Sequence, residues 1–427
     1  MQLFGTSGIR RLADQELIKL AFQVGLAAGS LYSEIIVGRD TRTSGSALRH
    51  SLMAGLTAAG AHCCDAGIVP TPTLAFAARK FQVGIMITAS HNPPEYNGLK
   101  LLNPDGSAFS GLQQKQIENL IENSSSLKLD WDRMKSEDFF ENAIADHITR
   151  IRRDFPDHHG IRVVVDCGGG AACNITPVLL ESMGCELIKI YCEPAGIFPR
   201  EMEPIESNLT ELCQAVRESG ANLGIAHDGD ADRMMAVDDR GRFIPGDKMM
   251  AILAKYCGTS SMVTTLDASM SIDEMGFNVR RTRVGDPYVS EELKNGGEFG
   301  GEPSGAWFFP RISFCPDGIY AAALITAIAS NHQLSDLADS IPYYPVIRGN
   351  LKGSPARIND LKNNLIEELN PLSYSTLDGI KLNFAHGWLL VRPSGTEPKI
   401  RVTAEAKNRD DAEELYRKST EIIKKYL

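Results

Sequence analysis

Three aspartates alternate along a short polar segment, HDGDADR, which follows a predicted strand over residues 222–226. Asp228, Asp230 and Asp232 can converge on one hard cation from such a turn, and oxygen ligands suit magnesium or calcium. An EF-hand is excluded, because Arg233 stands at the sixth position counted from Asp228, where that loop needs glycine. The segment is therefore either a metal site or a solvated acidic turn, and Arg233 either pairs with these carboxylates or contacts a phosphate.

A serine lies in a polar loop directly after a predicted buried strand over residues 83–88. Ser90 is followed by His91, Asn92 and two prolines. Open α/β sheets place their ligands at the ends of strands. Taken alone, the segment is typical of an Asn-Pro turn with an incidental serine. Lys100 and the aspartate segment elsewhere in the chain favour a catalytic role for Ser90 instead.

The segment VRPSGTEPKIRV near the C-terminus combines two arginines with two hydroxyl side chains and flexible backbone amides between two predicted strands. This composition is typical of a site for a phosphate dianion, and a charged turn is the alternative. Its candidate phosphate ligands are Arg392, Ser394, Gly395, Thr396 and Arg401. The chain has no GxxxxGK[ST] loop, so the sequence offers no site for a nucleoside triphosphate as phosphoryl donor.

A glycine-rich segment, FGGEPSGAW, has Glu302 and Ser304 as its polar side chains. A carboxylate and a hydroxyl on a loop that can approach a ligand closely suit the hydroxyl groups of a sugar. A plain turn is the alternative for this composition.

Arginines lie beside small hydroxyl residues in two N-terminal segments, FGTSGIRR and VGRDTRTSG. Arg10, Arg39 and Arg42 could help to position a phosphate. For Arg39 and Arg42, salt-bridged arginines at the surface are an equally good interpretation.

The composition of the 427-residue chain is that of a folded, multi-domain protein, with 43% hydrophobic and 23% charged residues. Its 44 Lys and Arg against 54 Asp and Glu give a net charge of −10, which argues against a nucleic-acid partner. It has no membrane-spanning apolar run and no signal-peptide start, so a cytoplasmic protein without a membrane partner is expected. Nine cysteines form no CxxC pair, so most should be buried as small hydrophobic residues.

The predicted elements repeat along the chain. A strand, a polar turn, a helix and a second strand are predicted over residues 34–67, again over 161–190, and more faintly from residue 261. The polar residues 123–128 and the charged, helix-like residues 130–154 are predicted as a surface excursion and a connector, and a helix over 317–338 should close the third unit. Three α/β domains in series follow, with boundaries predicted at 1–145, 146–243 and 244–343.

The pattern changes in the last predicted domain, residues 344–427. Helices are predicted over 357–369 and 409–426, and strands over 381–384, 387–391 and 399–406. This mixed order predicts a smaller α+β domain and not a fourth copy of the repeat.

Five segments in this order, FGTSGIR, TASHNPPEYNGLK, DGDADR, GEPSG and RPSGTEPKIRV, closely resemble the α-D-phosphohexomutase family over residues 4–402. Members of that family have four domains around a central cleft, three of a related α/β fold and a smaller C-terminal one. This organisation agrees with the repeat.

The resemblance implies roles in phosphoryl transfer. Ser90 would carry the phosphoryl group, with Lys100 as the general base and Arg10 as its electrostatic partner. His91 belongs to the family's loop and would be structural or supportive. Mg²⁺ would be held by the phosphate on Ser90 and by the three aspartates, Asp228, Asp230 and Asp232.

The resemblance also implies how substrate is bound. A phosphosugar would pass through a hexose 1,6-bisphosphate intermediate that turns over in the cleft, and Arg233 would contact substrate. Glu302 and Ser304 would bind sugar hydroxyls. The phosphate that is not reacting would be held by Arg392, Ser394, Gly395, Thr396 and Arg401.

The identity of the sugar depends on two segments. Asp286 stands where dual phosphomannomutase/phosphoglucomutases tend to have histidine, which favours the conversion of glucosamine 6-phosphate to glucosamine 1-phosphate. Ala306 and Trp307 stand where bacterial phosphoglucosamine mutases commonly have a histidine, so phosphomannomutase or phosphoglucomutase activity is the alternative. A non-catalytic phosphosugar-binding protein and a metal-dependent phosphatase are the competing classes of function.

Overall fold

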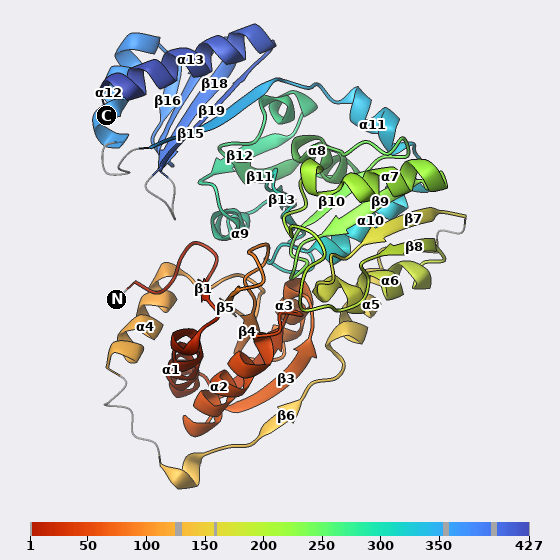
Figure 1. Ribbon diagram of the computed structural model, residues 1–427, viewed down its shortest axis with the longest axis vertical. Coiled ribbons are helices and arrows are strands. Elements are labelled where there is room, and N and C mark those ends of the chain that lie inside the picture. Colours follow the sequence, from red (N-terminus) through yellow and green to blue (C-terminus); the bar gives the residue numbers. More distant parts are fainter. Residues whose placement is uncertain (1, 124–129, 158–159, 353–357, 394–398, 427) are drawn as a thin grey trace.

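The computed structural model describes residues 2–123, 130–157, 160–352, 358–393 and 399–426. Within them the chain forms four separate β-sheets, and helices cover these sheets (Figure 1). The predicted fold class, three related α/β units followed by a smaller α+β unit, is confirmed.

The first sheet has six strands in the order β1-β5-β4-β2-β3-β6, and β1 and β5 run antiparallel to their neighbours. The apolar runs of β2 and β4 place both strands in its buried centre. The strands are β1 (Ile9–Leu12), β2 (Glu34–Arg39), β3 (His62–Ile68), β4 (Val83–Ile87), β5 (Tyr96–Leu102) and β6 (Glu137–Phe139). The helices are α1 (Gln15–Leu31), α2 (Gly45–Ala58), α3 (Thr71–Ala78) and α4 (Gly111–Glu122).

The segment predicted as a connector, residues 130–154, differs from that prediction. It contributes β6, which pairs in parallel with β3 at the edge of the first sheet. Helix α5 (Ala143–Arg152) follows and packs against α3. The predicted boundary after residue 145 falls inside α5, and the domain boundaries stay predictions.

The second and third sheets each have four strands, in the orders β10-β9-β7-β8 and β12-β11-β13-β14. The second contains β7 (Arg162–Asp166), β8 (Glu186–Ile190), β9 (Leu223–His227) and β10 (Met234–Val237), with helices α6 (Thr176–Ser182) and α7 (Thr210–Ser219). The third contains β11 (Ser261–Thr265), β12 (Asn278–Thr282), β13 (Phe299–Gly301) and β14 (Trp307–Phe308), with helices α8 (Gly246–Tyr256) and α9 (Asp286–Lys294).

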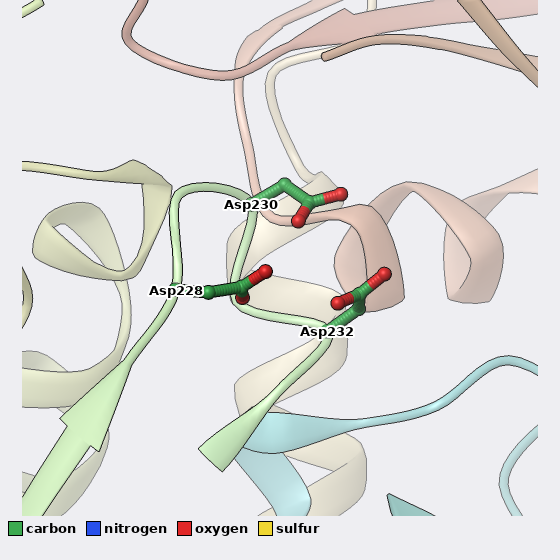
Figure 2. A group of neighbouring side chains, drawn as sticks. All are labelled: Asp228, Asp230 and Asp232. Atoms are coloured by element: carbon green, nitrogen blue, oxygen red, sulfur yellow. The ribbon is translucent and has the colours of Figure 1, made fainter. Parts of the chain in front are cut away.

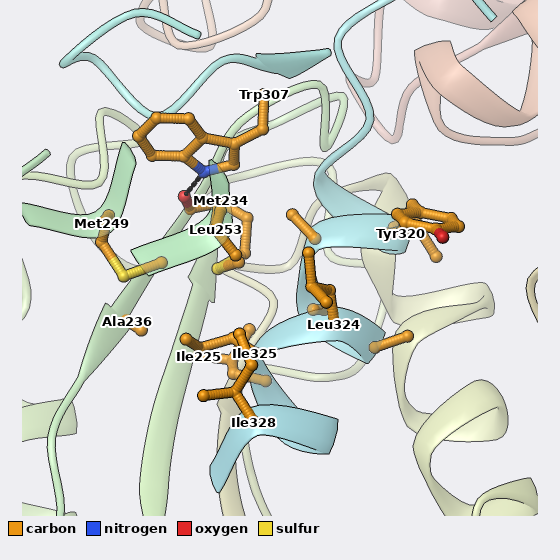
Figure 3. Close-up of a cluster of buried hydrophobic side chains, with 14 of the residues drawn as sticks. Ile225, Met234, Ala236, Met249, Leu253, Trp307, Tyr320, Leu324, Ile325 and Ile328 are labelled. Carbon is orange, nitrogen blue, oxygen red and sulfur yellow. Dashed lines mark hydrogen bonds between the residues drawn. The ribbon is translucent and has the colours of Figure 1, made fainter. Parts of the chain in front are cut away.

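The predicted helix over 317–338 is two helices, α10 (Gly318–Ala329) and α11 (Leu334–Ser340). Nearly all of α10 is buried, whereas Asn331 and His332, which follow it, are polar and exposed and end the apolar run. Helix α10 packs on β9 and β10 of the second sheet and on α8. Figure 3 shows Leu324, Ile325 and Ile328 of α10 in this core, which the second and third units share.

The fourth sheet is fully antiparallel, in the order β15-β19-β18-β17-β16. Its strands are β15 (Val346–Lys352), β16 (Ser373–Ser375), β17 (Ile380–Phe384), β18 (Gly387–Pro393) and β19 (Lys399–Ala406). One face packs its apolar side chains against α12 (Ile358–Leu369) and α13 (Arg409–Tyr426). Trp388 and Leu390 on the opposite face contact Leu266 of the third unit.

Each of the first three sheets contains an antiparallel hairpin whose loop carries predicted site residues. The loop between β4 and β5 carries Ser90, the loop between β9 and β10 carries the three aspartates, and the loop between β13 and β14 carries Glu302. The repeat along the chain therefore places predicted site residues in equivalent hairpin loops of the first three sheets. In the part of the chain that the structure describes, no helix is both long enough and apolar enough to cross a membrane.

Candidate active site

The aspartate segment is the loop of the hairpin between β9 and β10, and its three carboxylates point toward one another (Figure 2). One oxygen each of Asp228, Asp230 and Asp232 lies within 4.8 Å of the others, and all three side chains are buried. Ala231 has a φ of 55°, a conformation that is unusual for a residue with a Cβ and that lets the loop turn sharply. The alternative of a solvated acidic turn is therefore wrong for this segment, because all three side chains are buried.

The donor set of this loop fits a hard divalent cation. Burial, together with the charges of Asp232 and Asp230, raises the pKa of Asp228 well above its usual range. Oδ1 of Asp230 is buried and has no hydrogen-bond partner among the described residues. A bound Mg²⁺ ion would offset the repulsion among these buried carboxylates and would give the unpaired oxygen a partner.

Ser90 lies directly beside this carboxylate group. Its Oγ donates a hydrogen bond of 2.7 Å to Oδ2 of Asp228, and its side chain is buried. Its φ of 52° is left-handed, which is uncommon for serine and is a form of strain found at functional sites. His91 Nδ1 lies 3.3 Å from the same Oγ, and burial, with Arg233 and Arg10 nearby, lowers the pKa of His91 to about 2. His91 is therefore neutral at pH 7.

Lys100 extends from β5 into the aspartate group. Its Nζ lies 2.7 Å from Oδ2 of Asp230 and 2.6 Å from Oδ2 of Asp232. Burial opposes the charge, but the two carboxylates outweigh it and raise the pKa of Lys100 above its ordinary value. Lys100 is therefore protonated in this arrangement.

The N-terminal arginines differ in their surroundings. Nη1 of Arg10 donates to Oδ1 of Asn92 in the serine loop at 3.2 Å, so Arg10 reaches the site. Arg42 is completely buried in an ion pair with Asp40 and donates to backbone carbonyls of the serine loop. Arg42 is therefore salt-bridged, as one interpretation from the sequence has it, but it is buried and not at the surface. Its remaining N–H donors bind backbone carbonyls, so it does not contact a phosphate directly.

The glycine-rich segment forms the loop between β13 and β14 and is joined to the aspartate hairpin. The N–H of Met234 donates to Gly305 O at 3.0 Å, and Nε1 of Trp307 donates to Met234 O at 2.7 Å. Arg233 forms a β-bridge with Ala306, and its Nη1 lies 3.3 Å from Oε1 of Glu203. These bonds hold the aspartate loop and the predicted sugar loop as one unit.

Glu302 is held by two hydrogen bonds, one from Gly285 before helix α9 and one from Ser304 within its own loop. Its Oε1 accepts from the N–H of Gly285 at 2.7 Å, and its Oε2 accepts from Ser304 Oγ at 3.2 Å. Burial, with Asp286 and Asp267 nearby, raises the pKa of Glu302 to about 7. Asp286 in turn accepts a hydrogen bond of 2.7 Å from Ser7 Oγ, which connects this region to the N-terminal segment.

The predicted phosphate segment lies in the fourth sheet. Arg392 and Arg401 pair across β18 and β19 and line a cavity of about 320 Å³, together with Asp267 of the third unit. Arg348 of β15 lines the same cavity and was not predicted from the sequence. The other three predicted phosphate ligands, Ser394, Gly395 and Thr396, lie outside the described residues.

Further residues at the site were also not predicted. The hydroxyl of Thr71 donates to Oδ2 of Asp230, and the N–H of Thr71 donates to Asp230 O at 2.9 Å. Oδ2 of Asp378 lies 2.8 Å from Nε of Arg392. Thr71 begins a helix and Asp378 lies in a turn between two strands. Neither position has a sequence pattern that predicts contact with a distant segment.

Comparison with known proteins assigns the chain to a family. Models of phosphoglucomutase/phosphomannomutase match nearly all of it: α/β/α domain I over residues 1–128, domain II over 138–241, domain III over 245–344, and the C-terminal domain over 346–420. The chain belongs to the phosphoglucomutase/phosphomannomutase family. The predicted α-D-phosphohexomutase resemblance is thereby confirmed.

Within this family, the chain is 48% identical to the probable phosphoglucosamine mutase of Methanocella arvoryzae, covering all of this chain and 99% of that one. It is 40% identical to the phosphoglucosamine mutase of Methanocaldococcus jannaschii, with the same coverage. The crystal structure of a phosphoglucomutase/phosphomannomutase family protein from Burkholderia thailandensis has a TM-score of 0.88 at 26% identity, covering 99% of this chain and 97% of that one.

Proposed function

We propose that this chain is a phosphoglucosamine mutase, an isomerase that moves a phosphoryl group between the 6- and 1-positions of glucosamine phosphate. Relatives at 48% and 40% identity over the full length carry that name. The single observation that carries the chemistry is the 2.7 Å contact between Ser90 Oγ and Asp228, within the buried carboxylate group. It supports a phosphorylated Ser90 whose phosphate would lie beside a Mg²⁺ ion held by these carboxylates, and that ion would balance the charge.

The chemistry is a pair of phosphoryl transfers in opposite directions. In the first, the bond between Ser90 Oγ and phosphorus breaks as a sugar hydroxyl forms its own bond to phosphorus, giving a hexose 1,6-bisphosphate. The intermediate turns over, and its other phosphoryl group returns to Ser90. Such transfers depend mainly on in-line positioning and on neutralisation of the charge of the transferring group.

The residues around Ser90 would supply that neutralisation. Mg²⁺, held by the phosphate on Ser90 with Asp228, Asp230 and Asp232, would polarise the phosphoryl oxygens. Arg10 reaches the serine loop through Asn92 and would face the transferring group. Lys100 is the residue proposed to take the proton of the attacking hydroxyl. Because its contacts with Asp230 and Asp232 keep it protonated, those contacts must be exchanged before it can act as a base.

Substrate binding would be divided between two regions of the chain. Glu302 would accept hydrogen bonds from sugar hydroxyls, and Ser304 would donate to them. Arg233 would lie beside both residues. The phosphate that is not reacting would lie in the cavity lined by Arg392 and Arg401. Arginine forks match the oxygen atoms of a phosphate dianion, and a binding region outside the serine loop can hold either end of the bisphosphate in turn.

A phosphomannomutase or phosphoglucomutase is the second candidate, because Ala306 and Trp307 occupy the position where a histidine is common in bacterial phosphoglucosamine mutases.

We also propose that the protein is cytoplasmic and that its partner is a phosphosugar, not a nucleic acid or a membrane.

The test is turnover of a panel of hexose phosphates with Mg²⁺ and a hexose 1,6-bisphosphate primer. We expect the highest kcat/KM on glucosamine phosphate, conservation of total sugar phosphate, and no turnover by Ser90→Ala. Ser90→Ala should remain folded, because one loop hydroxyl contributes little to stability. A preference for mannose phosphate would favour the second candidate, and inorganic phosphate as the main product would favour a phosphatase.

A further inference from the structure

We infer that the buried Asp40–Arg42 ion pair and Thr88 position Ser90 for phosphoryl transfer, an inference that rests on the proposed function. None of the three reaches the reacting atoms. They hold the backbone of Ser90 on both sides, so they are positioning residues.

The carbonyl side of the serine loop is held by Arg42. Its Nη2 donates to Ser90 O at 2.8 Å and to Asn92 O at 2.6 Å, and its Nη1 donates to Pro93 O at 2.6 Å and to Tyr96 O at 2.8 Å. A guanidinium group has five N–H donors, and the fifth, on Nε, binds Oδ2 of Asp40 at 3.0 Å. All five donors are therefore in use, and four of them fix the path of one loop.

The amide side of Ser90 is held by the same ion pair through Thr88. The N–H of Ser90 donates to Thr88 Oγ1 at 2.9 Å, and this hydroxyl donates to Oδ2 of Asp40 at 2.6 Å. The side chains of Asp40, Arg42 and Thr88 are each completely buried, so water cannot replace these bonds. The carboxylate of Asp40 thus supports both backbone groups of Ser90, the N–H through Thr88 and the carbonyl through Arg42.

This arrangement accounts for the unusual conformation of Ser90. A left-handed backbone is strained at a residue with a Cβ and persists only where the surroundings fix it. With φ held at 52°, Ser90 Oγ points at Asp228. From the other side, Gly229 packs so closely that a Cβ there would lie 2.5 Å from Ser90 O. A relaxed Ser90 would lose both its direction toward Asp228 and its fit against the aspartate loop.

The test uses Thr88→Val, which removes the hydroxyl and keeps a branched side chain. Thr88→Ser, which keeps the hydroxyl, should recover most of the rate. Thr326→Val is the matched control, since Thr326 is equally buried and its hydroxyl donates to Ala322 O within helix α10. The rate measured is the single-turnover transfer of a phosphoryl group from hexose 1,6-bisphosphate to Ser90, followed by intact mass.

We expect Thr88→Val to slow this transfer on the order of 100-fold, with the KM for sugar phosphate changed by less than about threefold. Thr326→Val should leave the rate of transfer within about twofold of wild type. A folded Thr88→Val with a rate within about twofold of wild type would overturn the inference. If Thr88→Val does not fold, Arg42→Lys takes its place, because three lysine donors cannot hold four carbonyls.

A crystal structure of the same variant separates this inference from the proposed function. We expect Ser90 in Thr88→Val to leave its left-handed conformation and to lose the contact with Asp228. An unchanged Ser90 would overturn the inference, whatever reaction the wild-type chain catalyses. A wild-type chain that never takes a phosphoryl group on Ser90 would instead contradict the proposed function.

Discussion

Asp378 and Arg392 form an ion pair, with Oδ2 of Asp378 2.8 Å from Nε of Arg392, and the same oxygen accepts the N–H of Val284 at 3.0 Å. The neighbouring residue, Gly285, donates its N–H to Glu302. Asp378, Val284 and Gly285 thus link Arg392, the candidate phosphate-binding residue of the fourth sheet, to Glu302 in the candidate sugar loop of the third sheet.

Asp378→Asn should therefore weaken substrate binding. The amide oxygen can still accept from Val284, but the charge that orients Arg392 is lost. Loss of this orientation should raise the KM for sugar phosphate about tenfold, equivalent to about 1.4 kcal/mol, with a smaller change in kcat. Asp336→Asn is the control, because Asp336 pairs with Arg240 at the exposed surface. Equal KM values for the two variants would contradict the link.

Asp230→Asn should weaken the binding of Mg²⁺ at the aspartate loop. The substitution removes one negative charge from the proposed donor set, so the affinity should fall at least tenfold, about 1.4 kcal/mol. Isothermal titration calorimetry on the dephosphorylated chain measures this directly. Asp238→Asn changes a buried aspartate outside the group and should leave the affinity unchanged. Equal Mg²⁺ affinity in both variants would remove the loop as the metal site.

The affinity for substrate should depend on pH through Glu302. The pKa of this carboxyl is raised to about 7, so it is neutral below that pH and ionised above it. An ionised carboxylate accepts stronger hydrogen bonds from sugar hydroxyls, so KM should fall as the pH rises from about 6 to about 8. The substrate phosphate also titrates near pH 6, so the comparison is with Glu302→Gln. The same KM profile in wild type and Glu302→Gln would contradict this role.

Leu324→Ala should destabilise the second and third units together. Leu324 lies in the core that α10 shares with both (Figure 3). Removing a buried leucine side chain costs about 2–5 kcal/mol, so the midpoint of urea unfolding should fall with a single transition for both units. Leu112→Ala, at a leucine that is 80% exposed, should change the free energy of unfolding by less than about 0.5 kcal/mol. Separate transitions for the two units would contradict a common core.

Local patterns in the sequence predicted much of the fold and the centre of the site. Strand, turn and helix periodicity identified the repeated units, because each unit buries an apolar strand and turns at polar residues. The aspartate loop was predicted because three alternating carboxylates directly follow a strand. The role of the serine loop was predicted from its combination with Lys100 and the aspartates and from the family resemblance, because the serine segment alone is typical of a plain turn. The fourth unit was distinguished by its order of elements, which does not follow the repeat.

The contacts between distant segments could not be predicted. Arg42 is an ordinary charged residue in the sequence, and only the folded chain shows that five acceptors surround it. The bonds between Met234 and the loop of Glu302 join strands of two different sheets. Such contacts depend on how whole units pack, which local periodicity does not encode. The same limit applies to β6, a short exposed strand with no apolar pattern that joins the first sheet by pairing with β3.

The most direct test of the central claim is peptide mass mapping of the chain after incubation with hexose 1,6-bisphosphate and Mg²⁺. We predict one added phosphoryl group on the peptide that contains Ser90, its removal when glucosamine 6-phosphate is added in excess, and no added mass in Ser90→Ala. A phosphoryl group on another residue, or an unmodified chain that still interconverts the sugar phosphates, would contradict the account.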